Sequence, residues 1–418
     1  MVALPAGIVS MVNILASRRS STVLARHSWE KDHNMTLGSN RSRWWSRWRS
    51  PSNRRHGVPL LSLLLGMVLV LTTVLGVGSQ AQSRLVDVKL QLKWFPQAQF
   101  AGYLIAKEKG FYEAEGLNVE LLPIGDQSPI QTVTVGGADF GNTWITDLLT
   151  ARAQGLPVVH IAQIFQQSGY AMVSLKSSGI ETPLDFKGKK VGIWPSGNEY
   201  PALALMKAFD LTTSLDTGVS NPDVELITYG FDPALVFPDQ VDVASAMLYN
   251  ELNQIVGLGY PLSELNVIHL PDYDINLLED LLFTTERVLN DSNFKGSGQS
   301  GKEIAAKLVK ASIEGWDYAV ANPEETVQVV LTFCGATCQG SGSESDPLKH
   351  QTWQMTEIAK LYQAGPTLEG NAGLLDPSVY QANVETLKAL GILSADPPAA
   401  VVDYSVWEMA TGKSAPTS

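Results

Sequence analysis

Apolar and polar positions along the chain form short runs that change between a period of two and a helical period. Alternation predicts strands over residues 86–92 and 117–122, with a third short strand at 138–141. Apolar residues at helical spacing predict helices over 98–109 and 129–136 between these strands. Strands and helices that alternate in this order are typical of an α/β fold, and they predict parallel sheets with helical crossovers.

The same rhythm starts again after a strand at 171–175. A polar stretch at 176–179 is suited to a hinge crossing, and strands and helices of a second small sheet follow it. The chain returns at 267–270 and continues mainly as helices. We therefore predict two lobes around a ligand-binding cleft: lobe 1 from 83–175 and 268–418, with a helical C-terminal tail, and lobe 2 from 176–267.

The N-terminal part of the chain differs from the rest in charge and hydropathy. A basic, tryptophan-rich stretch precedes an apolar run over 58–77, and Ser79 and Ala81 follow at the spacing of a signal-peptidase site. Residues 1–82 are therefore predicted to be a signal peptide with a long basic leader. The alternative is an uncleaved N-terminal anchor, as in a membrane-anchored sensor domain, since the run is about as long as a minimal membrane span. Both alternatives place the body outside the cytoplasm, in the periplasm.

The distribution of charge along the chain limits the kinds of molecule that the protein can bind. The chain has 30 basic and 42 acidic residues; residues 1–82 hold ten of the basic and two of the acidic ones, which leaves 20 basic and 40 acidic residues in the body. A body this acidic repels polyanions, so we expect no nucleic-acid partner.

The sequence contains no motif typical of a catalytic site or a metal site. The histidines of the body are isolated, and no HExxH, GxSxG or P-loop motif is present, so we expect no catalytic residue, metal or cofactor. The two cysteines, Cys334 and Cys338, lie four residues apart. In an oxidising compartment this spacing favours a local disulfide over a metal site.

Three tryptophans follow predicted strands. Trp94 follows the first strand, Trp144 the third, and Trp194 the first strand of lobe 2. Because open α/β sheets bind ligands at the carboxyl ends of their strands, these indoles predict an aromatic-walled cleft for a flat ring. The alternative for each of them is packing in the core.

Polar candidates complete the expected site. Asn198 and Glu199 lie between a strand and a helix, where a carboxylate would repel a phosphate or sulfonate and suit a ring amine; an ordinary first-turn carboxylate is the alternative. Tyr249, Asn250 and Glu251 follow another strand and offer donors and acceptors for an amide or amidine edge, or else a polar helix start. Further ligand contacts are expected from Gln97, Tyr103 and Asn142.

Four ordered segments carry a family resemblance. They are Leu92–Pro96 (LKWFP), Tyr103–Leu117 (YLIAKEKGFYEAEGL), Gly136–Gly141 (GGADFG) and Leu184–Gly192 (LDFKGKKVG). Together they resemble the solute-binding proteins of ABC importers, in the thiamine pyrimidine-precursor-binding branch that also includes the yeast pyrimidine synthase. The resemblance covers about residues 85–330. It implies a type II periplasmic binding fold, a monomer that closes on a thiamine-type pyrimidine precursor and presents it to a permease in the inner membrane.

The chain departs from the synthase branch of that family. The cofactor-binding lysine of the synthases corresponds to Thr143 here, and their reactive histidine to Asp147. Threonine cannot form a Schiff base, so pyridoxal-linked synthesis is the less favoured alternative and we expect a binding protein rather than an enzyme. Riboflavin and sulfonate nutrients stay open as alternative ligands.

Overall fold

The computed structural model describes residues 85–338, 340 and 345–416. The predicted leader, signal peptide or anchor at 1–82 lies outside the described residues. Within the described part of the chain, no helix is both long and apolar enough to cross a membrane.

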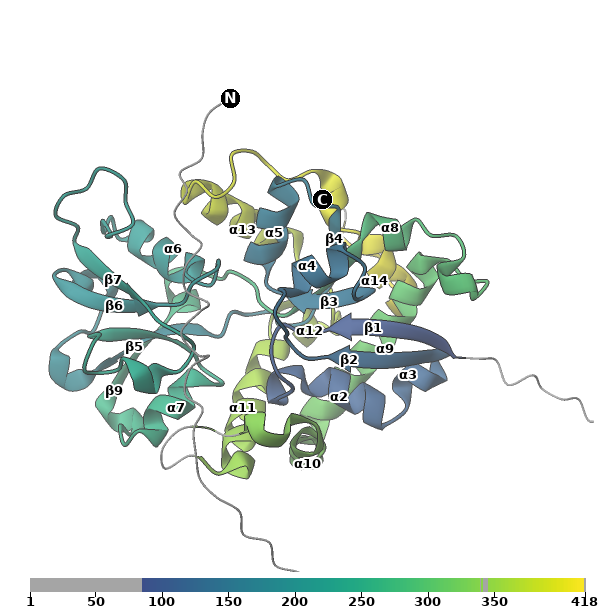
Figure 1. Cartoon of the computed structure of the whole chain (residues 1–418), viewed down its shortest axis with the longest axis horizontal. Coiled ribbons are helices and arrows are strands. Elements are labelled where there is room, and N and C mark those ends of the chain that lie inside the picture. Colours follow the sequence, from purple (N-terminus) through teal and green to yellow (C-terminus); the bar gives the residue numbers. More distant parts are fainter. Residues whose placement is uncertain (1–84, 339, 341–344, 417–418) are drawn as a thin grey trace, which may run out of the picture. The chain divides into compact units, whose positions relative to one another are not determined.

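The first sheet contains five strands in the order β2-β1-β3-β10-β4. Figure 1 labels β1, β2, β3 and β4 of this sheet. β1 (Val86–Gln91) pairs in parallel with β2 (Leu117–Leu122) and β3 (Phe140–Thr143), while β10 (Leu281–Thr285) runs antiparallel between β3 and β4 (Val158–Gln163). The expected parallel pairing is present for β1, β2 and β3, but β10 makes the sheet mixed. β10 has no alternation that would reveal it, because all five of its residues are buried.

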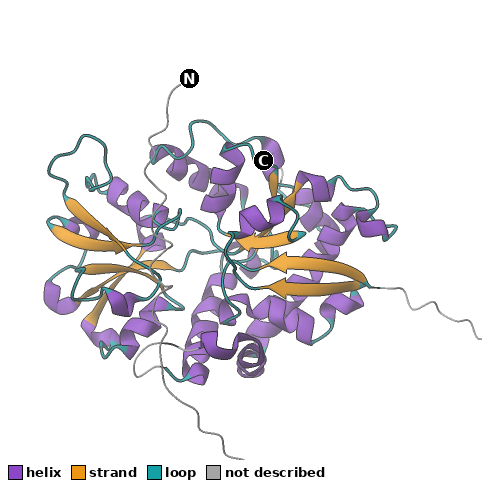
Figure 2. Cartoon of the chain, in the orientation of Figure 1, coloured by secondary structure: helices purple, strands orange, loops and turns teal. Residues whose placement is uncertain are grey.

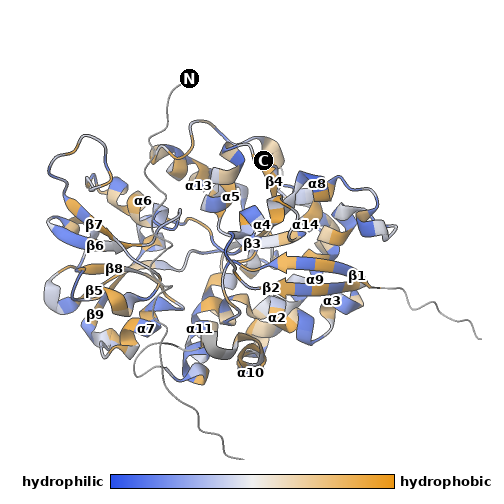
Figure 3. Ribbon diagram, in the orientation of Figure 1, coloured by the Kyte–Doolittle hydropathy of each residue, from blue (hydrophilic) through white to orange (hydrophobic). Residues whose placement is uncertain are grey.

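The second sheet has the order β7-β6-β8-β5-β9. β6 (Lys189–Ile193) pairs in parallel with β7 (Val224–Thr228) and β8 (Val243–Met247), and β5 (Tyr170–Leu175) runs antiparallel to both β8 and β9 (Leu265–His269). Figure 3 shows the hydrophobic colours of β5, which is buried inside this sheet. β5 therefore belongs to lobe 2, so the boundary predicted after residue 175 moves toward the N-terminus, and β9 extends lobe 2 to His269.

Two connecting segments run between the sheets, over 164–169 and 270–280. The predicted hinge at 176–179 is instead a 3-10 turn at the end of β5, closed by Gly179 in the left-handed region. The two connections are tied together: the Ser168 hydroxyl and the Gly169 N–H donate to the Glu279 carboxylate at 2.6 and 3.0 Å. We call Ser168, Gly169 and Glu279 the crossing cluster.

Helices cover both sheets (Figure 2). The closest packing joins α2 (Ala101–Glu108) and α9 (Gly301–Ala321), where a Cβ on Gly102 would lie 2.2 Å from the Trp316 ring and one on Gly315 would lie 2.1 Å from the Gly102 carbonyl. Glycine is needed at both positions because no side chain fits between the two backbones. In the described part of the chain, the other α-helices are α3 (Phe111–Ala114), α4 (Pro129–Thr134), α5 (Ile145–Ala153), α6 (Tyr200–Ala208), α7 (Glu251–Gly257), α8 (Glu286–Leu289), α10 (Pro323–Cys334), α11 (Pro347–Tyr362), α12 (Gly365–Leu368), α13 (Pro377–Ala389) and α14 (Tyr404–Thr411).

The C-terminal tail is helical, as predicted. Cys334 at the end of α10 and Cys338 form the expected disulfide. Residues of α11 pack against both α10 and the 3-10 turn at Ala98–Phe100, so the tail reaches the start of the first helical segment.

Candidate functional site

A cavity of about 740 Å³ lies between the two lobes and is lined by both. The lobe 1 lining comes mainly from the ends of β1 and β3 and from α4 and α5, and the lobe 2 lining comes from the ends of β6, β7 and β8. Its volume falls in the range typical of small-molecule sites. The carboxyl ends of parallel strands therefore face one another across the cavity, as the strand order predicts.

Aromatic rings form one wall of the cavity and connect the lobes. The Trp94 ring of lobe 1 lies 4.9 Å from the Phe231 ring of lobe 2, with an interplanar angle of 61°. Phe231 in turn lies 5.8 Å from Trp194, which is almost fully buried. Trp94 and Phe231 are only partly buried, so these two rings can contact a flat ligand.

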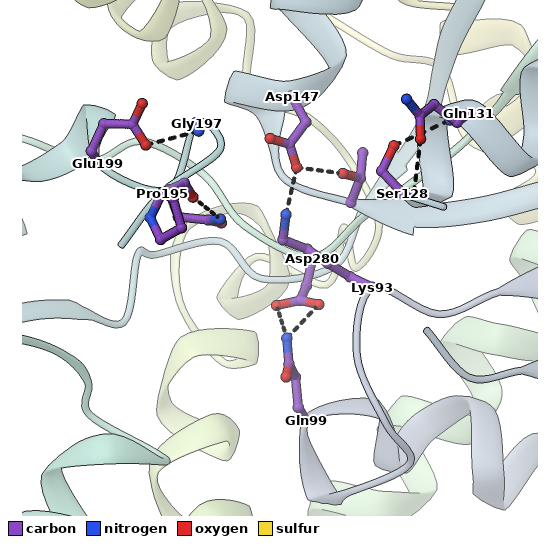
Figure 4. A network of polar contacts seen from close by, with 11 residues as sticks. Lys93, Gln99, Ser128, Gln131, Asp147, Pro195, Gly197, Glu199 and Asp280 are labelled. Atoms are coloured by element: carbon purple, nitrogen blue, oxygen red, sulfur yellow. Dashed lines mark hydrogen bonds and ion pairs between the residues drawn. The ribbon is translucent and has the colours of Figure 1, made fainter. Parts of the chain in front are cut away.

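Trp144 lines the cavity, but its ring already has a partner. The Lys93 ammonium lies 4.5 Å from the centroid of the Trp144 ring and is also paired with the Asp147 carboxylate. Asp147 further accepts a hydrogen bond from the Thr143 hydroxyl at 2.7 Å (Figure 4). Trp144 itself is 5% exposed. The predicted stacking role therefore fits Trp94 better than Trp144.

The turn before α6 faces this ion pair from lobe 2. Ser196 and Gly197 both have positive φ angles of 66° and 92°, and a Cβ on Gly197 would lie 3.3 Å from Asp147 Oδ1. Glu199 accepts the Gly197 N–H at 2.8 Å, and the Asn198 amide donates to the Pro195 carbonyl at 2.9 Å (Figure 4). The turn is thus held in an uncommon conformation that brings its backbone close to lobe 1.

Amide side chains with buried carboxylate partners form the inner end of the cavity. The side-chain amide of Gln97 donates to Gln99 Oε1 at 2.8 Å, and the side-chain amide of Gln99 donates to both carboxylate oxygens of Asp280 at 3.0 Å. On the lobe 2 side, Asn250 donates to Glu251 at 2.6 Å. Burial raises the pKa of Asp280 and that of Glu251 to about 7.

Helix α11 connects the two groups of amides. One amide nitrogen of Gln354 donates to Gln97 Oε1 at 3.2 Å and to Asn250 Oδ1 at 2.8 Å. His350 Nε2 lies 3.0 Å from the same Asn250 oxygen, and burial lowers the pKa of His350 to about 4. A side chain of the C-terminal tail thus bonds to cavity residues of both lobes.

Nine of the predicted site residues line the cavity, and two do not. Tyr103 and Asn142 are fully buried away from the cavity lining, where the Asn142 amide donates to the Tyr103 hydroxyl at 3.4 Å. These two predicted ligand contacts were wrong, because both side chains point into the core of lobe 1. The nine are Trp94, Gln97, Trp144, Trp194, Asn198, Glu199, Tyr249, Asn250 and Glu251.

Sequence reasoning missed three lining residues that matter for the chemistry. Phe231 follows β7 just as Trp194 follows β6, so the strand-end rule could have found it. Lys93 directly precedes Trp94, and Asp147 lies in the first turn of α5, but no local pattern shows that they pair. Among the described residues, no group of His, Cys, Asp and Glu is placed to hold a metal ion.

Comparison with known proteins identifies the fold and the relatives. A family model described as NMT1/THI5 like matches residues 97–326. The riboflavin-binding protein RibY of Chloroflexus aurantiacus is 30% identical over 75% of this chain and 84% of its own, and a formylaminopyrimidine-binding protein of Halalkalibacterium halodurans is 25% identical over 65% and 78%.

Solved structures match at lower identity. The ligand-binding component of an ABC-type import system from Staphylococcus aureus has a TM-score of 0.54 at 15% identity, covering 78% of this chain and all of its own. The periplasmic aliphatic sulphonate binding protein SsuA of Escherichia coli has a TM-score of 0.52 at 13% identity, covering 75% and 90%. At such identities the likeness concerns the fold, and it confirms the predicted periplasmic binding fold.

Proposed function

The chain belongs to the NMT1/THI5-like family, and we propose that it is the extracytoplasmic solute-binding component of an ABC importer for a flat, uncharged nitrogen heteroaromatic. The observation that carries this proposal is the cavity lined from both lobes, with Trp94 and Phe231 in contact across it. A ligand packed against these two rings would touch both lobes at once. It would therefore favour the closed arrangement, which a permease can recognise.

The charges around the cavity support a neutral or cationic ligand. The carboxylates of Asp147, Glu199 and Glu251 line it, whereas its one lining cation among the described residues is Lys93, already paired with Asp147. A phosphate or sulfonate would meet uncompensated negative charge and no free cation. This argues against the sulfonate alternative and against phosphorylated forms of a heteroaromatic.

The volume of the cavity favours riboflavin as the first candidate ligand. A cavity of about 740 Å³ lies toward the upper part of the range for small-molecule sites, and a single pyrimidine ring would fill little of it. The relative RibY is named for riboflavin. A thiamine-type pyrimidine precursor is the second candidate, because one oxygen of Glu199 accepts the Gly197 N–H and the other can accept a ring amine.

The cavity is poorly arranged for pyridoxal chemistry. Thr143 donates to Asp147, and Lys93, the nearest amine, is ion-paired with the same carboxylate. The Lys93 nitrogen is thus held by the Asp147 carboxylate and the face of the Trp144 ring instead of being presented to a carbonyl group. Purified protein incubated with pyridoxal phosphate should show no Schiff-base absorbance band that persists after dialysis.

A thermal-shift screen of the purified protein tests the proposal. A ligand that binds only the folded state raises the melting temperature by mass action. We expect a shift with riboflavin or a pyrimidine precursor and none with flavin mononucleotide or alkanesulfonates. A shift with the sulfonates alone would contradict the proposal.

A further inference from the structure

The side-chain amides of Gln97, Gln99 and Asn250, which we call the cavity amides, each have a fixed orientation of their N–H and oxygen ends. Gln99 donates to both oxygens of Asp280, so a flipped Gln99 amide would place its oxygen 3.0 Å from two carboxylate oxygens. Asn250 is fixed in the same way, since a flip would bring its oxygen to the Glu251 carboxylate at 2.6 Å. While the two carboxylates are ionised they accept only, and the amides must donate to them.

Gln354 holds the oxygen end of the Gln97 and Asn250 side-chain amides. Its side-chain nitrogen donates to Gln97 Oε1 and to Asn250 Oδ1, so the oxygens of these two amides are occupied from behind. Gln354 is fully buried and does not line the cavity. Hydrogen bonds therefore run from this one amide of α11 outward through each lobe to a buried carboxylate.

This arrangement leaves donors, not acceptors, for the ligand. Gln97 and Asn250 each use one N–H on a protein partner and keep a second. A separate observation points the same way: the buried indole N–H of Trp144, another lining residue, has no acceptor among the described residues. Buried N–H groups of this kind need an acceptor, which the ligand can supply.

We propose that Gln354 is a positioning residue for ligand specificity: together with the Asp280 and Glu251 carboxylates it holds the Gln97 and Asn250 amides so that the cavity offers N–H donors to an acceptor-bearing edge. The inference rests on the proposed function and adds the substrate class: a ring whose inner edge carries carbonyl oxygens or unprotonated ring nitrogens. A diamino edge at that position would leave donor facing donor.

Two bicyclic probes with the same skeleton test this directly. Pteridine-2,4-dione carries two carbonyl acceptors where pteridine-2,4-diamine carries two amino donors. Calorimetric titration at about pH 8.5 lies well above the pKa of about 7 to which burial raises Asp280 and Glu251. We expect the wild-type protein to bind the dione at least about tenfold more tightly. Equal binding, or preference for the diamine, overturns the inference while leaving the proposed function intact; binding of neither probe overturns both.

The variant Gln354→Glu tests the role of α11. A carboxylate in this place accepts rather than donates, so it repels the oxygens of Gln97 and Asn250, and the two amides lose the orientation in which Gln354 holds them. The ratio of the two affinities should then fall at least about tenfold or reverse. Gln328→Glu adds the same charge on the exposed side of α10 and should keep the wild-type ratio. An unchanged ratio in Gln354→Glu overturns the assigned role, and if that variant does not fold, the wild-type comparison still decides the inference.

Discussion

The carboxylate of Glu279 accepts a hydrogen bond from the Ser168 hydroxyl at 2.6 Å, and this contact joins the two segments that connect the lobes. Glu279 is almost fully buried, and burial raises its pKa to about 8. The folded protein therefore keeps a proton on Glu279 at a pH where the unfolded chain has lost it. The crossing cluster thus makes stability sensitive to pH near neutrality.

We expect the free energy of unfolding to fall as the pH rises from about 6.5 to 8.5. A raised carboxyl pKa stabilises the fold fully below the unfolded value, and the stabilisation is lost as the pH rises through about 8. Glu279 alone should account for about 2 kcal/mol of this loss. The pKa values of His160 and His350, lowered by burial to about 4, affect stability only at lower pH.

Urea unfolding at the two ends of this range measures the effect. Glu279→Gln should reduce the dependence to the smaller part that Asp280 and Glu251 contribute through their raised pKa of about 7. Glu264→Gln, at an exposed position of lobe 2, should leave the dependence as in the wild type. If Glu279→Gln retained the full slope, the titrating group would lie elsewhere.

Much of this architecture follows from local patterns in the sequence, and the crossing cluster shows why part of it does not. The strands β1 and β2 follow from alternation, and the tryptophans at strand ends follow from the strand-end rule. β10 could not be seen, because a strand buried on both faces has no alternation. The hinge was misplaced for a related reason: the polar stretch at 176–179 is only a turn, while the true connections contain buried residues whose partners are distant in sequence.

The residues of the candidate site also fall into those that local sequence predicts and those that it does not. Trp94 and Glu199 were found from their position after a strand, but position alone did not show that Tyr103 and Asn142 point into the core. Gln354 could not have been found, since its partner Gln97 is 257 residues away. Contacts of that range depend on the tertiary fold and leave no periodic signal.

The aromatic contact across the cavity predicts a role for Trp94 in binding. Trp94→Ala removes the ring face and its contact with Phe231, and it should weaken binding of the best solute about tenfold or more. Calorimetric titration measures the loss. Phe95→Ala is the matched control, because the neighbouring Phe95 is 38% exposed and does not line the cavity. Equal losses in both variants would show that the effect is not specific to the cavity wall.

The Lys93–Asp147 pair predicts a switch of charge selectivity. Asp147→Asn removes one lining carboxylate and frees the Lys93 ammonium, so the cavity should gain affinity for anionic solutes such as flavin mononucleotide by roughly tenfold or more. Fluorescence titration with riboflavin and flavin mononucleotide gives the ratio of affinities. Asp126→Asn, which changes an exposed carboxylate outside the lining, should leave that ratio unchanged. The same gain in both variants would point to overall charge instead of the freed lysine.

The disulfide predicts a redox effect on both stability and binding. Replacing Cys334 and Cys338 together by alanine removes a short cross-link, which should lower the free energy of unfolding by about 2 kcal/mol, and urea unfolding with and without dithiothreitol measures it. The reductant should destabilise the wild type and leave the double variant unchanged.

The effect on binding follows from the contacts of the Cys338 carbonyl. It accepts a hydrogen bond from Gln351 at 3.0 Å, and Gln351 in turn accepts the Ala98 N–H at 2.8 Å, next to the cavity residue Gln97. Loosening the Cys338 loop should therefore weaken solute binding by a few-fold as well. A double variant with lower stability and unaltered affinity would show that the disulfide supports the fold without holding the cavity.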